Sequence, residues 1–350
     1  MIQQSRPVLH SEDFKYIAGI VSSGQVARGD ITASLEKRFC RELGVRACIA
    51  TSHGTAALHL ALLALGVGEG DEVIVPSFAC ASLLYAVKYT GAIPVLVDID
   101  LATWNPTADI LETRIGSRTK AVIVTHSFGF PADVDPMRRF GVPIIEDCAQ
   151  ALGARYKDKP VGSWGDISVF SFYATKMICA GEGGMICTND DRLANIVRDL
   201  NNPDRQSVFR VRYNYKMSDL TAGLALSQIQ RLNGFVEKRR SIAQIYRGAL
   251  SNLPVKMQHA LSDSNPVYYR FVVRSDRPDE TMQAAREVGI ECDRPVHIPL
   301  HRNLETASAE NFRNTEAVWK SGVSIPLYPD LSDQECSHIA STLPSLLKSP

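Results

Sequence analysis

Short apolar runs alternate with helical patterns along the first two thirds of the chain. Seven runs predict strands, at 47–50, 72–76, 94–98, 121–125, 142–146, 166–171 and 184–188. Several of them, such as VIV and PII, are continuously apolar, and continuous runs are typical of strands that are buried on both faces. Helical stretches lie between the runs, for example at 55–65 and 77–89. The pattern therefore predicts an α/β fold in which a mostly parallel seven-stranded sheet is flanked by helices.

The pattern changes after about residue 200, where the turn sequence NNPD occupies 201–204. A long helix is predicted over 218–250, because Ser218 and Asp219 form a typical helix start. Shorter elements follow, with strands at 268–273 and 324–326 and helices at 278–288 and 332–347. These lengths favour a smaller C-terminal α+β domain, so we predict a large domain at 1–240 and a small domain at 241–350.

Composition and charge exclude several classes of protein. The 350 residues provide chain for about two domains, and 38 Lys+Arg balance 38 Asp+Glu. This balance argues against a broad basic surface that would bind nucleic acid or an anionic membrane. No segment resembles an apolar membrane span or a signal peptide, so we expect a cytoplasmic protein. The eight cysteines form no C-x-x-C pair, which favours core residues over disulfides or a metal site.

Three candidate chemical groups lie at the carboxyl ends of predicted strands, where ligands gather in an open α/β sheet. Asp147 directly follows the strand at 142–146, and Lys176 lies five residues beyond the end of the strand DISVFS. Gly54 and Thr55 lie between the strand ACIA and the next predicted helix. We expect these segments to converge in space, although nearly 100 residues separate some of them.

Each group also has an ordinary structural explanation. Gly54-Thr55 could form a simple turn and cap, although amides at a helix start also bind phosphate. Lys176 could lie on the surface, or it could be a partly desolvated amine that reacts with an aldehyde. Asp147 could cap a turn, or it could pair with a cationic ring nitrogen. Taken together, a phosphate cradle, a lysine and a carboxylate are what pyridoxal 5'-phosphate requires.

The sequence resembles the DegT/StrS-type sugar aminotransferases, which are fold-type I pyridoxal phosphate enzymes. The resemblance covers essentially the whole chain and includes SGQVARGDITASLEKRFCRELGV, TSHGTAALHLALLALGVGEGDEVIVPSF, IIEDCAQALGARY, GSWGDISVFSFYATKMICAGEGGMICTND and YNYKMSDLTAGLALSQIQRL. Each segment alone is a modest signal, but their order and spacing are specific. The resemblance implies that Lys176 is the Schiff-base lysine and that Asp147 is the partner of the pyridine nitrogen.

Further cofactor contacts follow from the same resemblance. Gln150 matches the residue beside the phenolic oxygen of the cofactor, whereas Gly54, Thr55 and Ser171 match the phosphate site. Asn214, in the sequence YNYKM, matches a residue that reaches the phosphate from the neighbouring subunit. The resemblance therefore implies a homodimer with two shared active sites. Without it, Gln150 would be read as a polar loop residue and Asn214 as a turn residue.

Two positions depart from the family pattern. The family commonly has an aromatic ring stacked on the cofactor where this sequence has Cys80, so the thiol, Phe78 or another aromatic side chain must cover the ring. His297, in RPVHIPLH, stands where the family often has a tyrosine near the substrate, and His301 matches a histidine of the family. A structural role is equally open for both histidines.

The resemblance implies an aminotransferase that moves an amino group from an amino acid to a keto sugar, with pyridoxamine 5'-phosphate formed in turnover. The implied donor is L-glutamate, or alternatively glutamine. The implied acceptor is a nucleotide-linked sugar, or alternatively a cyclitol or another ketone. Lys176 would serve as the general base.

Two other functions stay open as alternatives. A pyridoxamine-dependent sugar dehydratase has a similar chain, but such enzymes replace the lysine, commonly with histidine, whereas Lys176 is present here. A non-catalytic regulatory protein that binds the cofactor is the second alternative, and the presence of Lys176, Asp147 and Gln150 argues against it.

Overall fold

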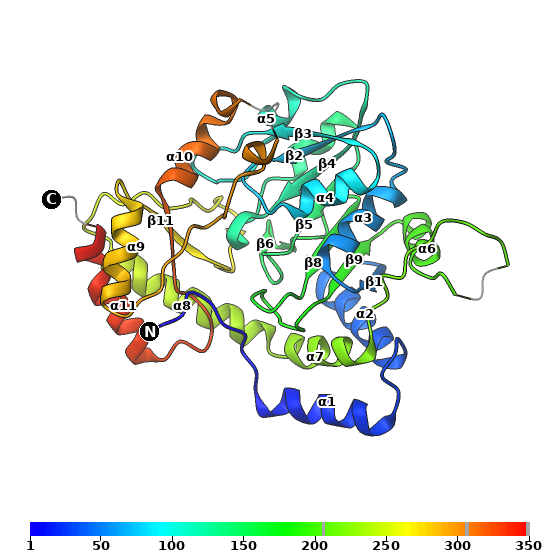
Figure 1. The fold of residues 1–350 in the computed structure, drawn as a ribbon, viewed down its shortest axis with the longest axis horizontal. Helices are drawn as coiled ribbons and strands as arrows, with labels where there is room; N and C mark the ends of the chain where they lie inside the picture. Colours follow the sequence, from blue (N-terminus) through cyan, green and yellow to red (C-terminus); the bar gives the residue numbers. More distant parts are fainter. Residues whose placement is uncertain (205–206, 305–307, 348–350) are drawn as a thin grey trace.

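A seven-stranded sheet forms the centre of the computed structural model, which describes residues 1–204, 207–304 and 308–347 (Figure 1). Across the sheet the strands are β1 (Ala47–Thr51), β9 (Gly184–Thr188), β8 (Ile167–Ser171), β5 (Ile144–Asp147), β4 (Thr119–Thr125), β2 (Glu72–Pro76) and β3 (Ile93–Val97). Strand β9 runs antiparallel to both of its neighbours, and all other neighbouring strands are parallel. The predicted fold class, an α/β protein with a mostly parallel seven-stranded sheet, is confirmed.

Helices cover both faces of this sheet (Figure 1). One face packs against α3 (Gly54–Ala64), α4 (Ser82–Tyr89) and α6 (Asp191–Leu200). The other face packs against α2 (Asp30–Leu43), α5 (Ala108–Glu112) and α7 (Asp219–Ile229), and α1 (Ser11–Ser23) lies outside α7. Helix α3 is apolar on nearly all sides, as a helix enclosed between other elements must be.

Two predicted helices differ from the observed ones. The helix predicted over 77–89 begins only at Ser82, because the backbone of Ser77 instead bonds to Val97 and Leu300. The helix predicted over 218–250 is divided into α7 and α8 (Leu232–Ala249). At the division the side chain of Arg231 turns to the carboxylate of Asp13, on α1, with contacts of 2.7 and 2.8 Å. Tertiary contacts therefore override the continuous helical pattern.

A second, smaller unit contains the C-terminal residues. Its two-stranded antiparallel sheet, β11 (Phe271–Arg274) and β12 (Gly322–Ile325), packs with α8, α9 (Pro278–Glu287) and α11 (Asp333–Leu347). Helix α8 connects the two units, since Val236 packs in the core of the large unit and Ile242 in that of the small one. The N-terminus also joins the small unit, where Ile2 pairs with Ile290. The remaining elements are α10 (Arg313–Ser321) and a small sheet of β6 (Arg155–Tyr156), β7 (Lys159–Pro160) and β10 (Ser264–Asn265).

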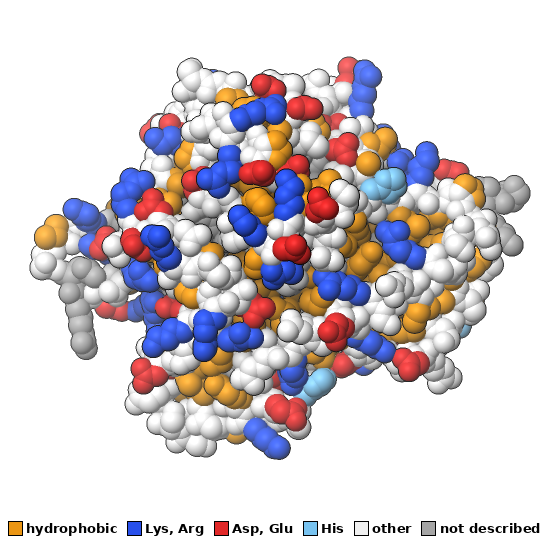
Figure 2. All heavy atoms as spheres, turned by 180° about the vertical axis from the view of Figure 1, so that it is seen from behind, with side chains coloured by type: hydrophobic (Ala, Val, Ile, Leu, Met, Phe, Trp, Pro, Cys, Tyr) orange, Lys and Arg blue, Asp and Glu red, His pale blue; other side chains and the backbone are white. Residues whose placement is uncertain are grey.

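Charged residues of both signs are mixed over the surface, as Figure 2 shows for one face. All eight cysteines are free thiols, and of these only Cys80 is exposed. Within the described ranges, no helix combines the length and the apolar character that a membrane crossing requires.

Candidate active site

The ends of three strands meet at one edge of the sheet. Thr51 of β1 and Ser171 of β8 both pair with Gly184, the first residue of β9. Asp147, at the end of β5, pairs with Val169 of β8. The three segments that were expected to converge from their positions in the sequence therefore lie together at one site.

Gly54, Thr55 and Ser171 form a cradle that fits an anion. Helix α3 begins at Gly54, and its cap, His53, accepts the Ala56 amide through Nδ1 at 2.9 Å. Among the residues that the structure describes, the amides of Gly54 and Thr55 have no hydrogen-bond acceptor. The ideal Cβ position of Gly54 lies 3.0 Å from Cβ and 3.3 Å from Oγ of Ser171. Open amides, a helix N-terminus and a hydroxyl group suit a phosphate. A Cβ at position 54 would make an unusually tight contact with Ser171, which would have to shift by a few tenths of an ångström.

Asp147 offers a carboxylate oxygen toward the same site. Its Oδ1 accepts the amide of Ala149 at 3.0 Å, whereas Oδ2 has no partner in the described part of the chain. Burial raises the pKa of Asp147, although the Ala149 amide and the positive charges of Lys176 and His126 act in the opposite direction. A buried carboxylate of this kind is stabilised by a cation placed against it, such as a protonated ring nitrogen.

Lys176 lies in the turn that follows β8, where its amide donates to the carbonyl of Tyr173 at 2.8 Å. The side chain is half-buried, and Nζ lies 5.2 Å from the ring centre of Tyr269. No described residue forms a hydrogen bond or salt bridge with this Nζ. The amine is therefore close enough to Asp147 to affect its pKa but is not engaged in a structural ion pair.

Gln150 has one end fixed and one end open. Its Oε1 accepts the amide of Phe128 at 2.7 Å, which fixes the orientation of the side-chain amide. Phe128 has a left-handed backbone with φ of 55°, and this hydrogen bond helps to hold it there. The Nε2 of Gln150 has no acceptor among the described residues, so it can donate to a ligand. Such a donor suits the phenolic oxygen of pyridoxal phosphate.

The two side chains that could cover a ligand ring, Cys80 and Phe78, differ in their exposure. Cys80 is exposed, with Sγ 3.4 Å from Oγ of Ser82. Phe78 is only 2% exposed and packs in an aromatic cluster with Trp104 and Phe128. The structure therefore favours Cys80 over Phe78 as the side chain that can lie against a ligand ring.

The two candidate substrate histidines have different surroundings. His297 is exposed. His301 is buried, and its Nδ1 lies 2.7 Å from Oγ of Ser77 while its Nε2 lies 2.8 Å from Oε1 of Glu316. Both nitrogens of His301 are thus engaged, and its ring stacks on that of Phe312 with 4.4 Å between the ring centres. The structure therefore favours a structural role for His301 over a role in substrate binding.

A buried hydrogen-bonded pair of Glu146 and His126, next to Asp147, was not predicted from the sequence. Glu146, which is fully buried, accepts the amides of Gly162, Trp164 and Gly165 at 2.7–2.9 Å and bonds His126 at 3.0 Å. Burial raises the pKa of Glu146, but His126 and the amides outweigh it, and the net shift is downward. The only signal in the sequence was a glutamate inside an otherwise apolar strand.

This pair and Cys148 place three possible metal-ligand atoms within 4.8 Å of one another. However, both oxygens of Glu146 are occupied by the hydrogen bonds above, and Nδ1 of His126 accepts the amide of Ala132 at 2.9 Å. The glutamate and the histidine therefore have no atom left for an ion. The cluster serves to fix the ends of β4 and β5.

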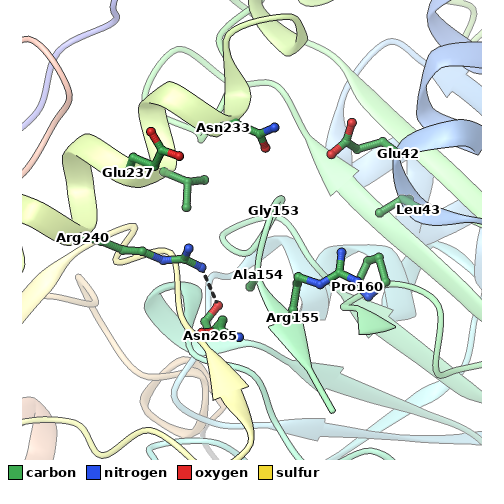
Figure 3. A pocket seen from close by; sticks show the side chains of 11 residues that line it. Glu42, Leu43, Gly153, Ala154, Arg155, Pro160, Asn233, Glu237, Arg240 and Asn265 are labelled. Atoms are coloured by element: carbon green, nitrogen blue, oxygen red, sulfur yellow. Dashed lines mark hydrogen bonds between the residues drawn. The ribbon is translucent and has the colours of Figure 1, made fainter. Parts of the chain in front are cut away.

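The residues of the site do not line the large surface cavity shown in Figure 3. That cavity, of about 270 Å³, lies between the end of α2, helix α8 and the β6–β7 hairpin. Arg240 and Arg155 lie on its walls together with Glu237 and Glu42. Its lining is mixed in charge, and Arg240 is bonded to the carbonyls of Asn265 and Pro266.

An α/β sheet with an unpaired lysine, an open carboxylate oxygen and an anion cradle at its strand ends defines a site of the kind that binds pyridoxal phosphate. The DegT/DnrJ/EryC1/StrS aminotransferase family model matches residues 7–344. The chain belongs to this family and is an aminotransferase. The family depends on pyridoxal phosphate.

Individual proteins agree with this assignment. A GDP-perosamine synthase from Caulobacter vibrioides is 35% identical over 365 residues, which cover 99% of this chain and 98% of that protein. The aminotransferase TlmJ from Streptoalloteichus hindustanus is similar in structure, with a TM-score of 0.93, 31% identity and 99% of both chains covered. Spr1654 from Streptococcus pneumoniae, in its PLP-form, has a TM-score of 0.93 at 25% identity over 99% of this chain and 98% of that one.

The Glu316 cluster around His301 gives a prediction for acid stability. Hydrogen bonding from Arg302, assisted by Lys320 and His301, outweighs burial and lowers the pKa of Glu316 to about 2, from 4.5 in the unfolded chain. A depressed pKa stabilises the fold above pH 4.5, and this stabilisation is lost as the pH falls toward 2. We expect Glu316→Gln to lower the free energy of unfolding at neutral pH by about 1–3 kcal/mol.

Urea unfolding measured at several pH values tests this. The difference in the free energy of unfolding between the wild type and Glu316→Gln should become smaller as the pH falls below about 4.5. The matched control is Glu280→Gln, which removes a carboxylate that is 69% exposed in its ion pair with Arg277 and should change little. A difference that does not depend on pH would contradict the assigned role of the carboxylate.

Proposed function

We propose that the protein transfers an amino group from L-glutamate to a nucleotide-linked keto sugar with pyridoxal phosphate as its cofactor. The observation that carries this proposal is the unpaired amine of Lys176, which shares one edge of the sheet with Asp147 and with the Gly54–Ser171 cradle. The name of the Caulobacter relative supports a GDP-linked sugar as the acceptor class. Glutamate is the donor that the family resemblance implies.

Each cofactor-binding role has a matching free group. The open amides of Gly54 and Thr55 and the hydroxyl of Ser171 would hold the phosphate, and Nε2 of Gln150 would donate to the phenolic oxygen. Oδ2 of Asp147 would accept a hydrogen bond from the ring nitrogen. When bound, pyridoxal phosphate supplies an aldehyde and a ring that withdraws electrons from the substrate carbon.

Lys176 would carry out the proton transfers. Its Nζ would hold the cofactor through the aldehyde. It would also accept the proton from the α-carbon of the donor and return a proton in the second half of the reaction. Asp147 would keep the ring nitrogen protonated in both halves, because its negative charge favours the cationic form.

A homodimer with shared active sites is part of the proposal. Asn214 is exposed, and the neighbouring carbonyl of Tyr215 accepts the amide of Ser52 at 2.7 Å, beside the anion cradle. Residues 207–213, just before it, carry exposed apolar side chains, with Phe209 93% and Val211 66% exposed. The described parts of the chain between α6 and α7 can be followed in Figure 1. Exposed apolar side chains of this kind favour contact with a second copy of the chain.

The first prediction concerns the lysine. Lys176→Met keeps the length of the side chain but removes the amine, so we expect loss of turnover and loss of the visible absorbance that the bound cofactor gives. In the wild type, adding glutamate should convert that absorbance to the pyridoxamine form, and adding a GDP-linked keto sugar should reverse it. The measurement is absorbance spectroscopy of the purified protein with each substrate in turn.

Lys37→Met, which removes an amine from helix α2, is the matched control and should retain both the absorbance and the turnover. Full turnover by Lys176→Met would refute the assignment. A wild type that binds the cofactor but shows no spectral change with glutamate would favour the non-catalytic alternative.

The second prediction concerns the cradle. In Gly54→Ala the new Cβ would lie 3.0 Å from Cβ of Ser171, a strand residue that cannot easily move. We expect the Kd for pyridoxal phosphate to rise about tenfold or more, equivalent to roughly 1.4 kcal/mol. Gly248→Ala is the control, because this helical glycine has open space around it. Equal affinities in the two variants would mean that the phosphate binds elsewhere.

The third prediction concerns the dimer. We expect light scattering to give the mass of a dimer for the wild type, and Val211→Asp to raise the dimer dissociation constant at least about tenfold, because it places a charge in the apolar contact. Val288→Asp, at a 43% exposed valine in the small unit, should leave the dimer intact. A monomeric wild type would remove Asn214 from the proposed site.

A further inference from the structure

Tyr269 lies against the reactive lysine but has no role in the site described so far. It lies just before β11, and its side chain is buried in the core of the large unit. The centre of its ring lies 5.2 Å from Nζ of Lys176, and its hydroxyl lies 3.2 Å from Oγ1 of Thr175. One phenol therefore contacts two consecutive residues of the turn that carries the amine.

The backbone of Tyr269 is fixed on both sides. Its amide donates to the carbonyl of Phe128 at 2.9 Å, and the amide of Phe128 in turn donates to Gln150 at 2.7 Å. The carbonyl of Tyr269 accepts Nη1 of Arg239, on α8, at 3.1 Å. The ring is therefore held in place relative to Gln150 and α8, and it presents a rigid surface to Lys176.

Positive charges surround this phenol. Besides Lys176, the guanidinium carbon of Arg270 lies 5.7 Å from the ring centre. Arg239 is 3% exposed and bonds to the carbonyls of Tyr268, Tyr269 and Leu327, with no carboxylate partner among the described residues. A buried cation without an anionic partner is unfavourable, so a negative charge on the neighbouring phenol would stabilise it.

The phenol responds to these charges. Burial raises the pKa of Tyr269, but Lys176, Arg270 and Arg239, together with the hydrogen bond to Thr175, outweigh burial and lower the pKa to about 8. Among the charges that lower this pKa, that of Lys176 has the largest effect.

We propose that Tyr269 is a positioning residue for Lys176, which holds the amine against its ring face and holds Thr175 through its hydroxyl. The proposal rests on the proposed function, since it gives Lys176 a fixed position from which to exchange protons with the substrate. An ammonium group over an aromatic face is attracted by the ring, and the phenolate form adds a full negative charge. The segment that leads into β11 would thereby contribute directly to the site.

The first experiment uses the protein without cofactor and follows tyrosinate absorbance against pH. Of the 11 tyrosines, one should titrate near pH 8, and this transition should be missing in Tyr269→Phe. In Lys176→Met the transition should move to higher pH, because the largest favourable charge has been removed. Tyr246→Phe is the control, since Tyr246 is also buried, with its hydroxyl bonded to the carbonyl of Pro326 at 3.0 Å, and burial raises its pKa.

The second experiment measures the amine itself. We expect Tyr269→Phe to change the rate at which an amine-reactive reagent labels Lys176 in the cofactor-free protein, as followed by peptide mass spectrometry, because the hydroxyl no longer holds Thr175. We also expect kcat to fall about tenfold while KM for glutamate changes little, since misplacing a reacting group affects the transition state more than binding. Tyr246→Phe should change neither quantity.

Three outcomes would overturn the proposal: no tyrosine that titrates near pH 8, a transition that Lys176→Met does not move, or unchanged labelling and kcat in Tyr269→Phe. Failure of the proposed function gives a different result. In that case Lys176→Met would remain active or the wild type would not take up the cofactor, while the coupled titration of Tyr269 in the cofactor-free protein would still be observed.

Discussion

The close contact between the ends of β1, β9 and β8 is the constraint on which the site depends. Gly184 pairs with Thr51 on one side and with Ser171 on the other. A Cβ at Gly184 would lie 2.7 Å from Oγ1 of Thr51 and 2.8 Å from the backbone of His53, so only glycine lets the turn after β1 close over the sheet. That closure brings Gly54 against Ser171 and orients the N-terminus of α3 toward the site. The antiparallel strand β9 thus makes the anion cradle possible in an otherwise parallel sheet.

Buried charge supports the site from the opposite face of the sheet. Glu146 and Asp147 are consecutive residues of β5, so their side chains point to opposite faces. Glu146 satisfies both of its oxygens with three loop amides and His126, which fixes the ends of β4 and β5 without needing a cation from outside. Asp147 therefore occupies a fixed position while one of its oxygens stays open. A rigid carboxylate that lacks a full set of partners is suited to a cationic ligand.

The sequence predicted what depends on local pattern and missed what depends on distant contacts. The strands at 72–76 and 184–188 have the predicted bounds, because continuous apolar runs end there at polar or turn residues. The placement of Asp147 and Lys176 followed from the same periodicity. The division between α7 and α8 could not be predicted, since it depends on Asp13. Nor could the burial of His301, which bonds a serine 224 residues away, or the contact of Tyr269 with the lysine, which joins segments that lie far apart in the sequence.

Hydrogen-bond satisfaction distinguishes the candidate site residues from two nearby polar clusters. His301 resembles a family site residue, yet both of its nitrogens are engaged, and the cluster around Glu146 has the composition of a metal site but no open atom on its glutamate or histidine. Five groups of the candidate site have no protein partner in the described part of the chain, namely the amides of Gly54 and Thr55, Oδ2 of Asp147, Nζ of Lys176 and Nε2 of Gln150. They lie together at one edge of the sheet, where a single ligand can reach all of them and supply the missing partners. The set contains donors for a phosphate and a phenolic oxygen, an acceptor for a ring nitrogen and an amine for an aldehyde, and these are the groups that one pyridoxal phosphate molecule presents.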